Sequence, residues 1–285
     1  MLLTDVGAIK ELLARHGFTF SKSLGQNFII NPSICPRMAE SCGADEHTGV
    51  LEIGPGIGVL TRELSARAKK VVSIELDRRL FPLLEETLKD SKNVTLIPGD
   101  VMKIDLGSLI AKEFGDMPVV VCANLPYYIT SPVILRLLEE QLPLRSITVM
   151  VQKEAAERLC APIGSRESGA VTVAVNYYTE VKRLFLVSAG SFLPPPRVDS
   201  AVIRLDLLAS PPVQTDRRVF FKIVRAGFSQ RRKTLCNALS SMLPMTKEEI
   251  NRALTECGLS PTVRAEQLSL QDFERLSACL EAGVK

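Results

Sequence analysis

The residues best suited to chemistry in this 285-residue chain form the tetrapeptide Asn124-Leu125-Pro126-Tyr127, which follows an apolar run at 119–122. An amino group on a nucleobase is a poor nucleophile because its lone pair is delocalised into the ring. Two acceptors, the Asn124 side-chain oxygen and a carbonyl of the proline-stiffened loop, would favour the pyramidal geometry that frees this pair. The Tyr127 ring offers a face on which a flipped base stacks, worth about 1–3 kcal/mol. These four residues are therefore the predicted catalytic segment, although Asn and Pro are also common in ordinary turns.

A glycine-rich loop, Gly54-Pro55-Gly56-Ile57-Gly58, follows an earlier apolar run at 50–53. Such a loop lets the backbone approach a ligand closely. The dinucleotide fingerprint G-x-G-x-x-G would need a glycine where Val59 stands, and Pro55 has no N–H to offer a pyrophosphate. The spacing instead resembles the S-adenosylmethionine loop of Rossmann-like methyltransferases, whose cofactor carries no phosphate. Gly54 and Gly56 are accordingly predicted cofactor contacts.

Two acidic residues follow the next two apolar runs. Glu75 ends the run at 71–74, where a carboxylate can accept both ribose hydroxyls of a cofactor. Asp100, with Val101 beside it, follows the run at 94–97 and can accept from an adenine amino group. A single acid at a strand end is common in α/β sheets. Three features at the same edge of one sheet favour a ligand site.

Composition excludes several other classes of protein. Hydrophobic residues make up 46% and charged residues 24%, as in ordinary globular proteins. The seven cysteines include no CxxC pair, and the two histidines are near no cysteine or carboxylate cluster, so no metal site and no Ser-His-Asp triad is predicted. No apolar run approaches the roughly 20 residues of a membrane span, and residues 1–17 have helical rather than signal-peptide character. We expect a soluble, cytoplasmic protein that does not associate with membranes.

The order of the elements predicts an α/β fold. Strand-like runs at 50–53, 71–74, 94–97, 119–122 and 147–151 alternate with helical segments near 59–68, 78–89, 106–114 and 131–140. This alternation is typical of a mostly parallel sheet covered on both faces. Thr4 and Gly17 bracket a first helix, and Asn31-Pro32 predicts the start of another. Segment 171–175 suits either a strand or a buried helix.

A second, all-helical part is predicted at the C-terminus. Strands at 181–187 and 201–207 flank a stiff loop with three prolines at 194–196, and Pro211-Pro212 suits a linker. The helical segments beyond it are 216–228, 230–242, 246–257 and 270–281. We therefore predict a catalytic domain at 1–208 and a small helical domain at 209–285.

The net charge of +3 lies entirely in residues 206–285, which hold 12 Lys and Arg and nine Asp and Glu. Residues 217–233 contain seven of these basic residues and no acid. A charged run is often only a solvated helix face, but seven unopposed bases favour contact with phosphates. The predicted RNA-binding residues are Arg218, Lys222, Arg225, Arg231, Arg232 and Lys233.

Three segments occur in a fixed order along the chain: Ser23-Leu24-Gly25-Gln26-Asn27-Phe28, Asn124-Leu125-Pro126-Tyr127-Tyr128-Ile129, and the segment from Phe192-Leu193-Pro194-Pro195-Pro196-Arg197 to Val202. Together they resemble the ribosomal RNA adenine N6-dimethyltransferase family. The likeness continues through Ser229-Gln230-Arg231-Arg232-Lys233-Thr234 to Arg264-Ala265-Glu266, and it is greatest to the small-subunit branch of the family. Tyr128 stands where some members carry Asn, which leaves the tetrapeptide itself intact.

The resemblance implies a Rossmann-like class I S-adenosylmethionine-dependent methyltransferase. It implies cofactor contacts from Asn27, the Ile29 backbone, Gly54, Glu75, Asp100 and Asn124, with the target adenine held between Tyr127 and Phe192. The implied activity dimethylates N6 of two adjacent adenosines in the 3′-terminal hairpin of small-subunit (16S) rRNA during ribosome biogenesis, with the C-terminal helices docked on rRNA. We expect a monomer acting on the assembling small subunit.

Three alternatives remain open at the level of sequence. A large-subunit adenine methyltransferase of the macrolide-resistance type shares the loop and the stacking residue, but that group typically has Ile where Leu125 stands. A non-catalytic ribosome-assembly or transcription factor could retain the fold and the basic face, although Asn124, Tyr127 and Glu75 are all intact. An NAD-dependent oxidoreductase is disfavoured by Pro55 and Val59.

Overall fold

The computed structural model describes residues 2–21 and 24–284. It forms two compact units, the first from Met1–Ala156 and Val181–Leu207, the second from Glu157–Glu180 and Leu208–Lys285. The boundary expected from the sequence, after residue 208, is one residue beyond the point at which the chain passes from the first unit to the second, between Leu207 and Leu208. Residues 157–180, however, group with the second unit. Their helix α8 (Ala170–Tyr178) belongs there because the Tyr177 ring packs on Phe220, with centroids 5.0 Å apart. Segment 171–175, which the sequence left open, is thus helical.

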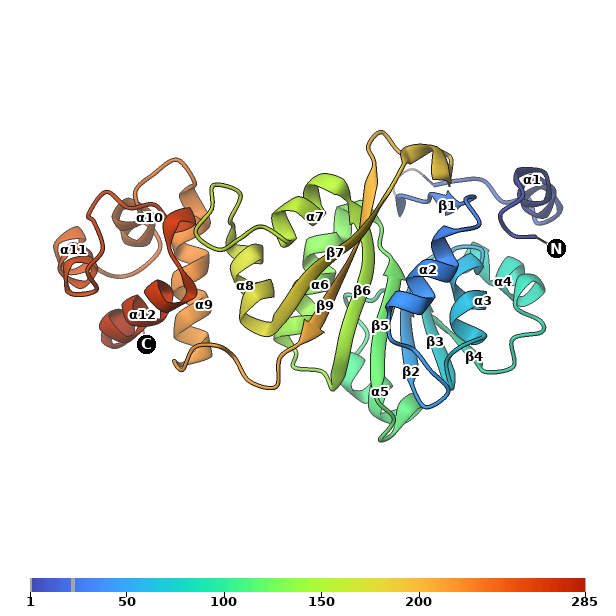
Figure 1. Ribbon diagram of the computed structural model, residues 1–285, viewed down its shortest axis with the longest axis horizontal. Coiled ribbons are helices and arrows are strands. Elements are labelled where there is room, and N and C mark those ends of the chain that lie inside the picture. The colour runs from blue at the N-terminus through green and yellow to red at the C-terminus, as the bar shows by residue number, and fades with distance from the viewer. Residues whose placement is uncertain (1, 22–23, 285) are drawn as a thin grey trace. The chain divides into compact units, whose positions relative to one another are not determined.

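The first unit is built on a seven-stranded sheet among the described residues, in the order β4-β3-β2-β5-β6-β9-β7 (Figure 1). Strands β4, β3, β2, β5 and β6 pair in parallel, and β9 pairs antiparallel with β6. Every strand predicted from the sequence is present. Their bounds are β2 (Gly49–Ile53), β3 (Lys70–Glu75), β4 (Val94–Pro98), β5 (Val119–Asn124), β6 (Leu144–Gln152), β7 (Thr179–Val187) and β9 (Ser200–Leu207).

A two-stranded antiparallel sheet joins distant parts of the first unit. Strand β1 (Phe28–Ile29) pairs with β8 (Phe192–Leu193), so that Ile29 lies opposite Phe192.

The helices of this unit, with α7 crossing into the second unit, are α1 (Val6–Arg15), α2 (Ile34–Ser41), α3 (Val59–Ser65), η2 (Arg78–Leu80), α4 (Phe81–Thr87), α5 (Leu106–Phe114), η3 (Tyr127–Ile129), α6 (Thr130–Glu139), α7 (Lys153–Leu159) and η4 (Ala189–Ser191).

Helices α2 and α3 cover one face of the sheet. Their buried side chains, among them Met38 and Leu64, pack with Val71, Val120 and Met150 from the strands in one hydrophobic cluster. Alternate strand residues with β-branched side chains suit such a face. Figure 1 shows α2 in front of the sheet and α6 behind it, as the alternation of strands and helices predicted.

Two helix starts in the first unit differ from those expected. Helix α1 is capped by Asp5, whose side chain accepts from the Ala8 N–H at 2.7 Å, rather than by Thr4. Asn31 does not cap α2, which begins at Ile34. Instead the Asn31 side chain accepts from the Ser33 N–H at 3.1 Å and forms a turn before the helix. An Asx turn and an N-cap use the same residue types, so the sequence could not separate them.

The second unit is helical. In α9 the buried Phe220 and Val224 face the core and Phe220 packs on Phe273, with centroids 6.2 Å apart. The expected helix at 230–242 is shorter, because Thr234 accepts from the Asn237 N–H and starts α10 there. Besides α8 the elements are α9 (Arg217–Gly227), η5 (Phe228–Gln230), α10 (Leu235–Ser240), α11 (Lys247–Glu256), η6 (Ala265–Gln267) and α12 (Leu270–Val284). In the described part of the chain, no helix has the length and apolar character to cross a membrane.

Candidate active site

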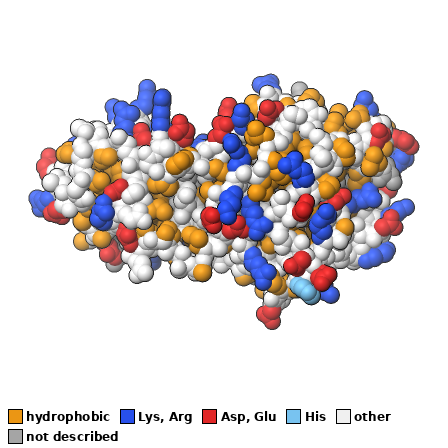
Figure 2. Space-filling model, viewed as in Figure 1, with side chains coloured by type: hydrophobic (Ala, Val, Ile, Leu, Met, Phe, Trp, Pro, Cys, Tyr) orange, Lys and Arg blue, Asp and Glu red, His pale blue; other side chains and the backbone are white. Residues whose placement is uncertain are grey.

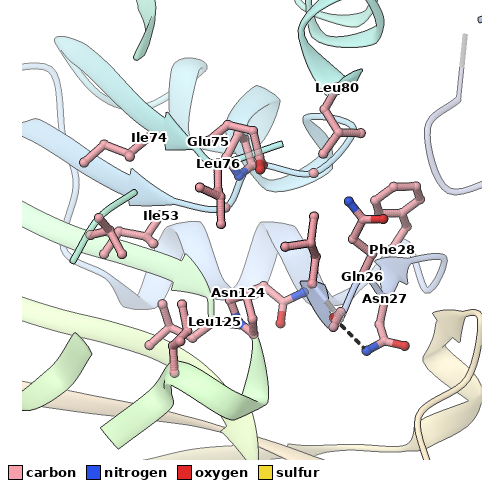
Figure 3. A pocket seen from close by; sticks show the side chains of 18 of the residues that line it. Gln26, Asn27, Phe28, Ile53, Ile74, Glu75, Leu76, Leu80, Asn124 and Leu125 are labelled. Carbon is pink, nitrogen blue, oxygen red and sulfur yellow. Dashed lines mark hydrogen bonds between the residues drawn. The ribbon is translucent and has the colours of Figure 1, made fainter. Parts of the chain in front are cut away.

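A cavity of about 330 Å³ opens at the carboxyl ends of strands β2, β3, β4 and β5. Ligands of open α/β sheets bind at this edge. Figure 3 shows the labelled side chains arranged around the cavity, with Glu75 on the opposite side from Asn124 and Leu125, and with Gln26 and Asn27 on a third side. The described residues that line it fall at 24–29, 53–57, 59–60, 74–76, 80, 99–102 and 124–129.

The glycine-rich loop forms one wall of this cavity. Gly54, Gly56 and Gly58 have φ values of 69°, 60° and 87°, a region that favours glycine. A Cβ atom built on Gly56 would lie 3.3 Å from the Phe28 ring, which is already close for a carbon contact. The loop therefore needs glycine both for its backbone conformation and for its contact with β1.

Glu75 is a buried carboxylate at the end of β3. Its Oε1 accepts from the Asp77 N–H at 2.8 Å. Burial raises the pKa of Glu75 to about 7, against the opposing effect of hydrogen bonds from the Asp77 and Gly56 backbone. Ligand hydroxyls that donate to this carboxylate would stabilise its ionised form, which burial disfavours.

A second buried acid precedes the glycine-rich loop and does not line the cavity. Glu52 in β2 is fully buried, and its Oε2 accepts from the hydroxyl of Ser73, its neighbour on β3, at 2.6 Å. Burial raises the pKa of Glu52 to about 7 as well. The hydrogen bond between Glu52 and Ser73 joins β2, which leads into Gly54, to β3, which ends in Glu75.

The turn after β4 holds Asp100 at the cavity. The Asp100 Oδ1 accepts from the Met102 N–H at 2.9 Å, which fixes the carboxylate relative to the turn. Arg136 of α6 donates to the carbonyl oxygens of Val101 and, at 2.7 Å, of Ile104. One arginine thus fixes both ends of the segment that follows Asp100.

The segment before β1 is tied to the end of β3. Gln26 Nε2 donates to Asp77 Oδ2 at 2.8 Å, while Arg79 donates to the same carboxylate and lowers its pKa. Asn27 Nδ2 donates to the Gly25 carbonyl at 3.1 Å, as Figure 3 shows. Gln26 and Asp77 therefore connect the N-terminal wall to Glu75, because the Asp77 N–H is the donor to Glu75.

The tetrapeptide leaves β5 in a tight turn. The Leu125 N–H donates to the Met150 carbonyl at 3.2 Å, and the Pro126 carbonyl accepts from the Ile129 N–H at 3.1 Å. Tyr127 is half-buried and its hydroxyl lies 2.7 Å from Ser200 Oγ. Asn124, at the end of β5, lines the cavity beside Gly54, whose Cβ position lies 4.0 Å from the Asn124 carbonyl oxygen.

The sequence-predicted site residues fall in three places. All eight predicted cofactor contacts line the cavity, as do Leu125, Pro126 and Tyr127. Phe192 does not line it, because its ring is 2% exposed in the core cluster with Met38 and Met150. Its part in holding a base stays a prediction that requires the ring to move outward. The six predicted RNA-binding residues are all exposed, on α9 and the following turn of the second unit.

Among the lining residues that the sequence analysis did not predict, three have large and well-exposed side chains. Leu76, Met102 and Tyr128 are large apolar or aromatic side chains that are 49%, 36% and 54% exposed. Such exposure suits contact with a flat ligand ring. An apolar residue one or two positions after a strand-end acid was the available signal for Leu76 and Met102.

The charge of the cavity restricts its ligand. Glu75 and Asp100 line it, and the described lining residues include no Lys or Arg. Such a wall suits a cationic or neutral ligand better than a pyrophosphate. Within residues 2–21 and 24–284, no group of three or more His, Cys, Asp and Glu residues is placed to hold a metal ion.

Known proteins match nearly the whole chain. The family model for ribosomal RNA adenine dimethylase matches residues 17–281. Ribosomal RNA small subunit methyltransferase A of Geobacillus thermodenitrificans (strain NG80-2) is 50% identical over 279 residues, which cover 96% of this chain and 95% of that protein. The protein of the same name from Bacillus mycoides (strain KBAB4) is 48% identical over 276 residues, or 95% of this chain and 94% of that one.

Solved structures agree with these matches. A dimethyladenosine transferase from Plasmodium falciparum is similar with a TM-score of 0.74 and 27% identity, covering 90% of this chain and 98% of that one. The 23S rRNA methyltransferase ErmE is similar with a TM-score of 0.67 and 26% identity, covering 90% of this chain and all of that one. The Rossmann-like methyltransferase fold predicted from the sequence is thereby confirmed. The chain belongs to the ribosomal RNA adenine dimethylase family.

Proposed function

We propose that this protein is an S-adenosylmethionine-dependent methyltransferase that dimethylates N6 of two adjacent adenosines in the 3′-terminal hairpin of small-subunit rRNA. The observation that carries the proposal is the meeting of three groups at one cavity: the glycine loop, the acids Glu75 and Asp100, and the Asn124–Tyr127 turn. Family membership and relatives that are named for small-subunit methylation support the same activity.

The cavity fits S-adenosylmethionine. A buried carboxylate with a pKa of about 7 at Glu75 suits two ribose hydroxyls, and the exposed apolar side chains of Leu76 and Met102 suit the faces of an adenine. Asp100 and the Val101 backbone, which also line the cavity, are proposed to read the adenine edge. Gly54, Gly56, Asn27 and the Ile29 backbone complete the proposed contacts.

The chain's own residues contribute alignment and hydrogen-bond acceptors. S-adenosylmethionine, when bound, supplies an activated methyl group on a sulfonium. The Asn124 side-chain oxygen and a carbonyl of the Leu125-Pro126 segment accept from the two N–H bonds of the target amine, which directs its lone pair at that methyl group. Rigid alignment of two reactants provides a large part of such catalysis. No general base is required, because the methylated amine readily loses its extra proton to water.

The target base would have to leave its stack to reach this site. Tyr127 provides the aromatic face for the flipped adenine, and Phe192 is proposed as the opposite face after outward movement of its ring. A base stacked on an aromatic residue gains about 1–3 kcal/mol, which offsets part of the cost of flipping.

The second unit is proposed to bind rRNA. Arg218, Lys222 and Arg225 recur at helical spacing on the exposed face of α9, and Arg231, Arg232 and Lys233 follow in the next turn. Figure 2 shows a group of basic side chains at the upper edge of this unit. The assembling small subunit, encountered by a monomer in the cytoplasm, is the proposed partner.

The small-subunit rRNA is the favoured substrate among the family's possible targets. Leu125 and relatives at about 50% identity support it. The likeness to ErmE keeps large-subunit methylation as the second candidate, at 26% identity. A non-catalytic assembly factor is disfavoured because Asn124 is present and lines an open cavity. An NAD-dependent oxidoreductase is disfavoured because the cavity wall carries Glu75 and Asp100, which would repel a pyrophosphate.

Mass spectrometry of rRNA from cells with and without this protein tests the function. We expect two adjacent N6,N6-dimethyladenosines in the small-subunit hairpin to disappear on deletion and to return on complementation. Unchanged small-subunit modification, or a methyl group lost from large-subunit rRNA with macrolide resistance on expression, would contradict the proposal.

A further inference from the structure

The Tyr127 ring is attached to the sheet at its far end. The Tyr127 hydroxyl lies 2.7 Å from the hydroxyl of Ser200, which is the first residue of β9 and is fully buried. Tyr127 itself is half-buried and is one of the residues that line the cavity. The backbone of Tyr127 belongs to the short helix η3, outside the sheet. The hydroxyl pair is therefore a second attachment point, on a different element.

Ser200 stands on the same framework as Asn124. Strand β9 pairs with β6 so that Ser200 lies opposite Gln152 and Val202 opposite Met150. Strand β5 pairs with β6 so that Asn124 also lies opposite Met150. Ser200 is thus held firmly and at a fixed distance along the sheet from Asn124.

The hydrogen bond restricts the orientation of the ring. A tyrosine ring attached only through its Cβ samples several χ1 wells, whereas one held at both ends keeps a single well. Ser200 is buried, so little water competes for this hydrogen bond. Burial raises the pKa of Tyr127, and the phenol therefore keeps its proton.

We propose that Ser200 is a positioning residue for the methyl-transfer reaction. Its hydroxyl fixes the plane of the Tyr127 ring, so that a stacked adenine presents its amino group to Asn124 at one angle. Ser200 itself is not among the residues that line the cavity, so its proposed action is through Tyr127. This inference rests on the proposed function, because it requires a base to stack on Tyr127.

A matched pair of buried serines separates positioning from stability. Ser146 lies in β6, is also buried, and donates to the Cys42 carbonyl at 3.1 Å, away from the cavity. Each serine would be replaced by alanine in the full-length protein. The kcat and the KM for S-adenosylmethionine would be measured with undermethylated small subunits as substrate, and Tm would be measured on the purified protein. We expect similar decreases in Tm for both variants, a decrease in kcat of about tenfold for S200A only, and an unchanged KM for S-adenosylmethionine.

Removing the other hydroxyl gives a second readout. Y127F keeps the ring but removes its hydrogen bond to Ser200. We expect Y127F, S200A and the double variant to have the same kcat, because each breaks one shared interaction. If Ser200 acted only on stability, the loss of kcat in the double variant would be the sum of the losses in S200A and Y127F, expressed as free energies. Additive losses, equal kcat in S200A and S146A, or wild-type kcat in S200A would each overturn the proposal.

A third variant distinguishes failure of this inference from failure of the proposed function. Y127A removes the stacking face altogether. If Y127A is inactive while S200A and Y127F are normal, the positioning role is refuted and the proposed function stands. If Y127A retains wild-type activity, base stacking on Tyr127 is itself wrong, and the inference is refuted with it.

Discussion

Burial sets the protonation behaviour of two acids in the first unit. Burial raises the pKa of Glu75, which lines the cavity, to about 7, and it raises the pKa of Glu52, which does not line it, to about 7 as well. In the proposed complex the ionised Glu75 accepts from ribose hydroxyls, whereas the protonated form must donate from one of its oxygens. Under this proposal, cofactor binding and deprotonation of Glu75 favour one another.

Cofactor affinity is expected to depend on pH through Glu75. With a pKa of about 7 and binding to the ionised form, affinity falls as the pH drops below 7, by about tenfold between pH 8 and pH 6. Calorimetric titration with S-adenosylhomocysteine at several pH values measures this. Affinity should fall rather than rise at low pH, because the Glu75 carboxyl is protonated there and the proposed contacts need its ionised form.

The variant E75Q is the control for this titration. It cannot ionise, so its affinity should be lower at pH 8 and nearly constant down to pH 6. If E75Q kept the pH dependence of the wild type, the fall in affinity at low pH would come from Glu52 or another group and not from Glu75. A flat wild-type profile would contradict coupling between cofactor binding and ionisation of Glu75 near pH 7.

At the scale of elements, the site depends on interactions between loops and helices distant in sequence. The clearest is the arginine of α6, Arg136, that holds the turn after β4 by donating to Val101 and Ile104. Because Asp100 opens that turn, its carboxylate is placed by a residue on another helix.

Replacing Arg136 with alanine should loosen this turn. We expect about a tenfold loss of S-adenosylhomocysteine affinity with little change in kcat at saturation, because two hydrogen bonds from a charged donor to the turn are removed. R67A is the matched control, since Arg67 donates to the Glu63 carbonyl and carboxylate on α3 at 3.1 Å. Equal losses of affinity in both variants would show that Arg136 has no specific effect on the turn.

The sequence predicted elements and strand-end residues better than it predicted interactions between distant side chains. Glu75, Asp100 and Asn124 line the cavity at the strand ends where the sequence located them, because strand ends are a local property of the chain, and their contact with a cofactor stays a prediction. The start of α2 after Asn31 and the start of α10 at Thr234 were missed, because turn and cap residues are the same types. Arg136 and Ser200 act across the sheet, and no local pattern marks such partners. Phe192 lies in the core through the pairing of β8 with β1, which the sequence did not reveal.

At the scale of the whole molecule, the two units carry different charges. The site in the first unit has acids and no described basic residue on its wall, and the second unit carries the basic excess of the chain. This separation suits a cationic cofactor on one unit and an anionic substrate on the other.

Changing Arg231, Arg232 and Lys233 together to alanine should weaken rRNA binding without changing kcat. The dependence of log K on log salt scales with the number of phosphates that the protein neutralises, so the slope should become shallower by about two to three. Binding to small subunits over a range of salt concentrations measures it. The same charge change at Lys247, Arg252 and Arg275, which are exposed in α11 and α12, is the control. Equal slopes for the two triple variants would show that the basic run does not bind RNA specifically.

The most direct test of the account is methyl transfer by N124A. Undermethylated small subunits, S-adenosylmethionine and either wild-type or N124A protein would be incubated, and the rRNA analysed by mass spectrometry. Wild type should form two adjacent N6,N6-dimethyladenosines. N124A should form none while binding S-adenosylhomocysteine within about tenfold of wild type, because the missing acceptor acts mainly on the reacting amine. Near-normal dimethylation by N124A would contradict the central claim that this asparagine activates the adenine amino group.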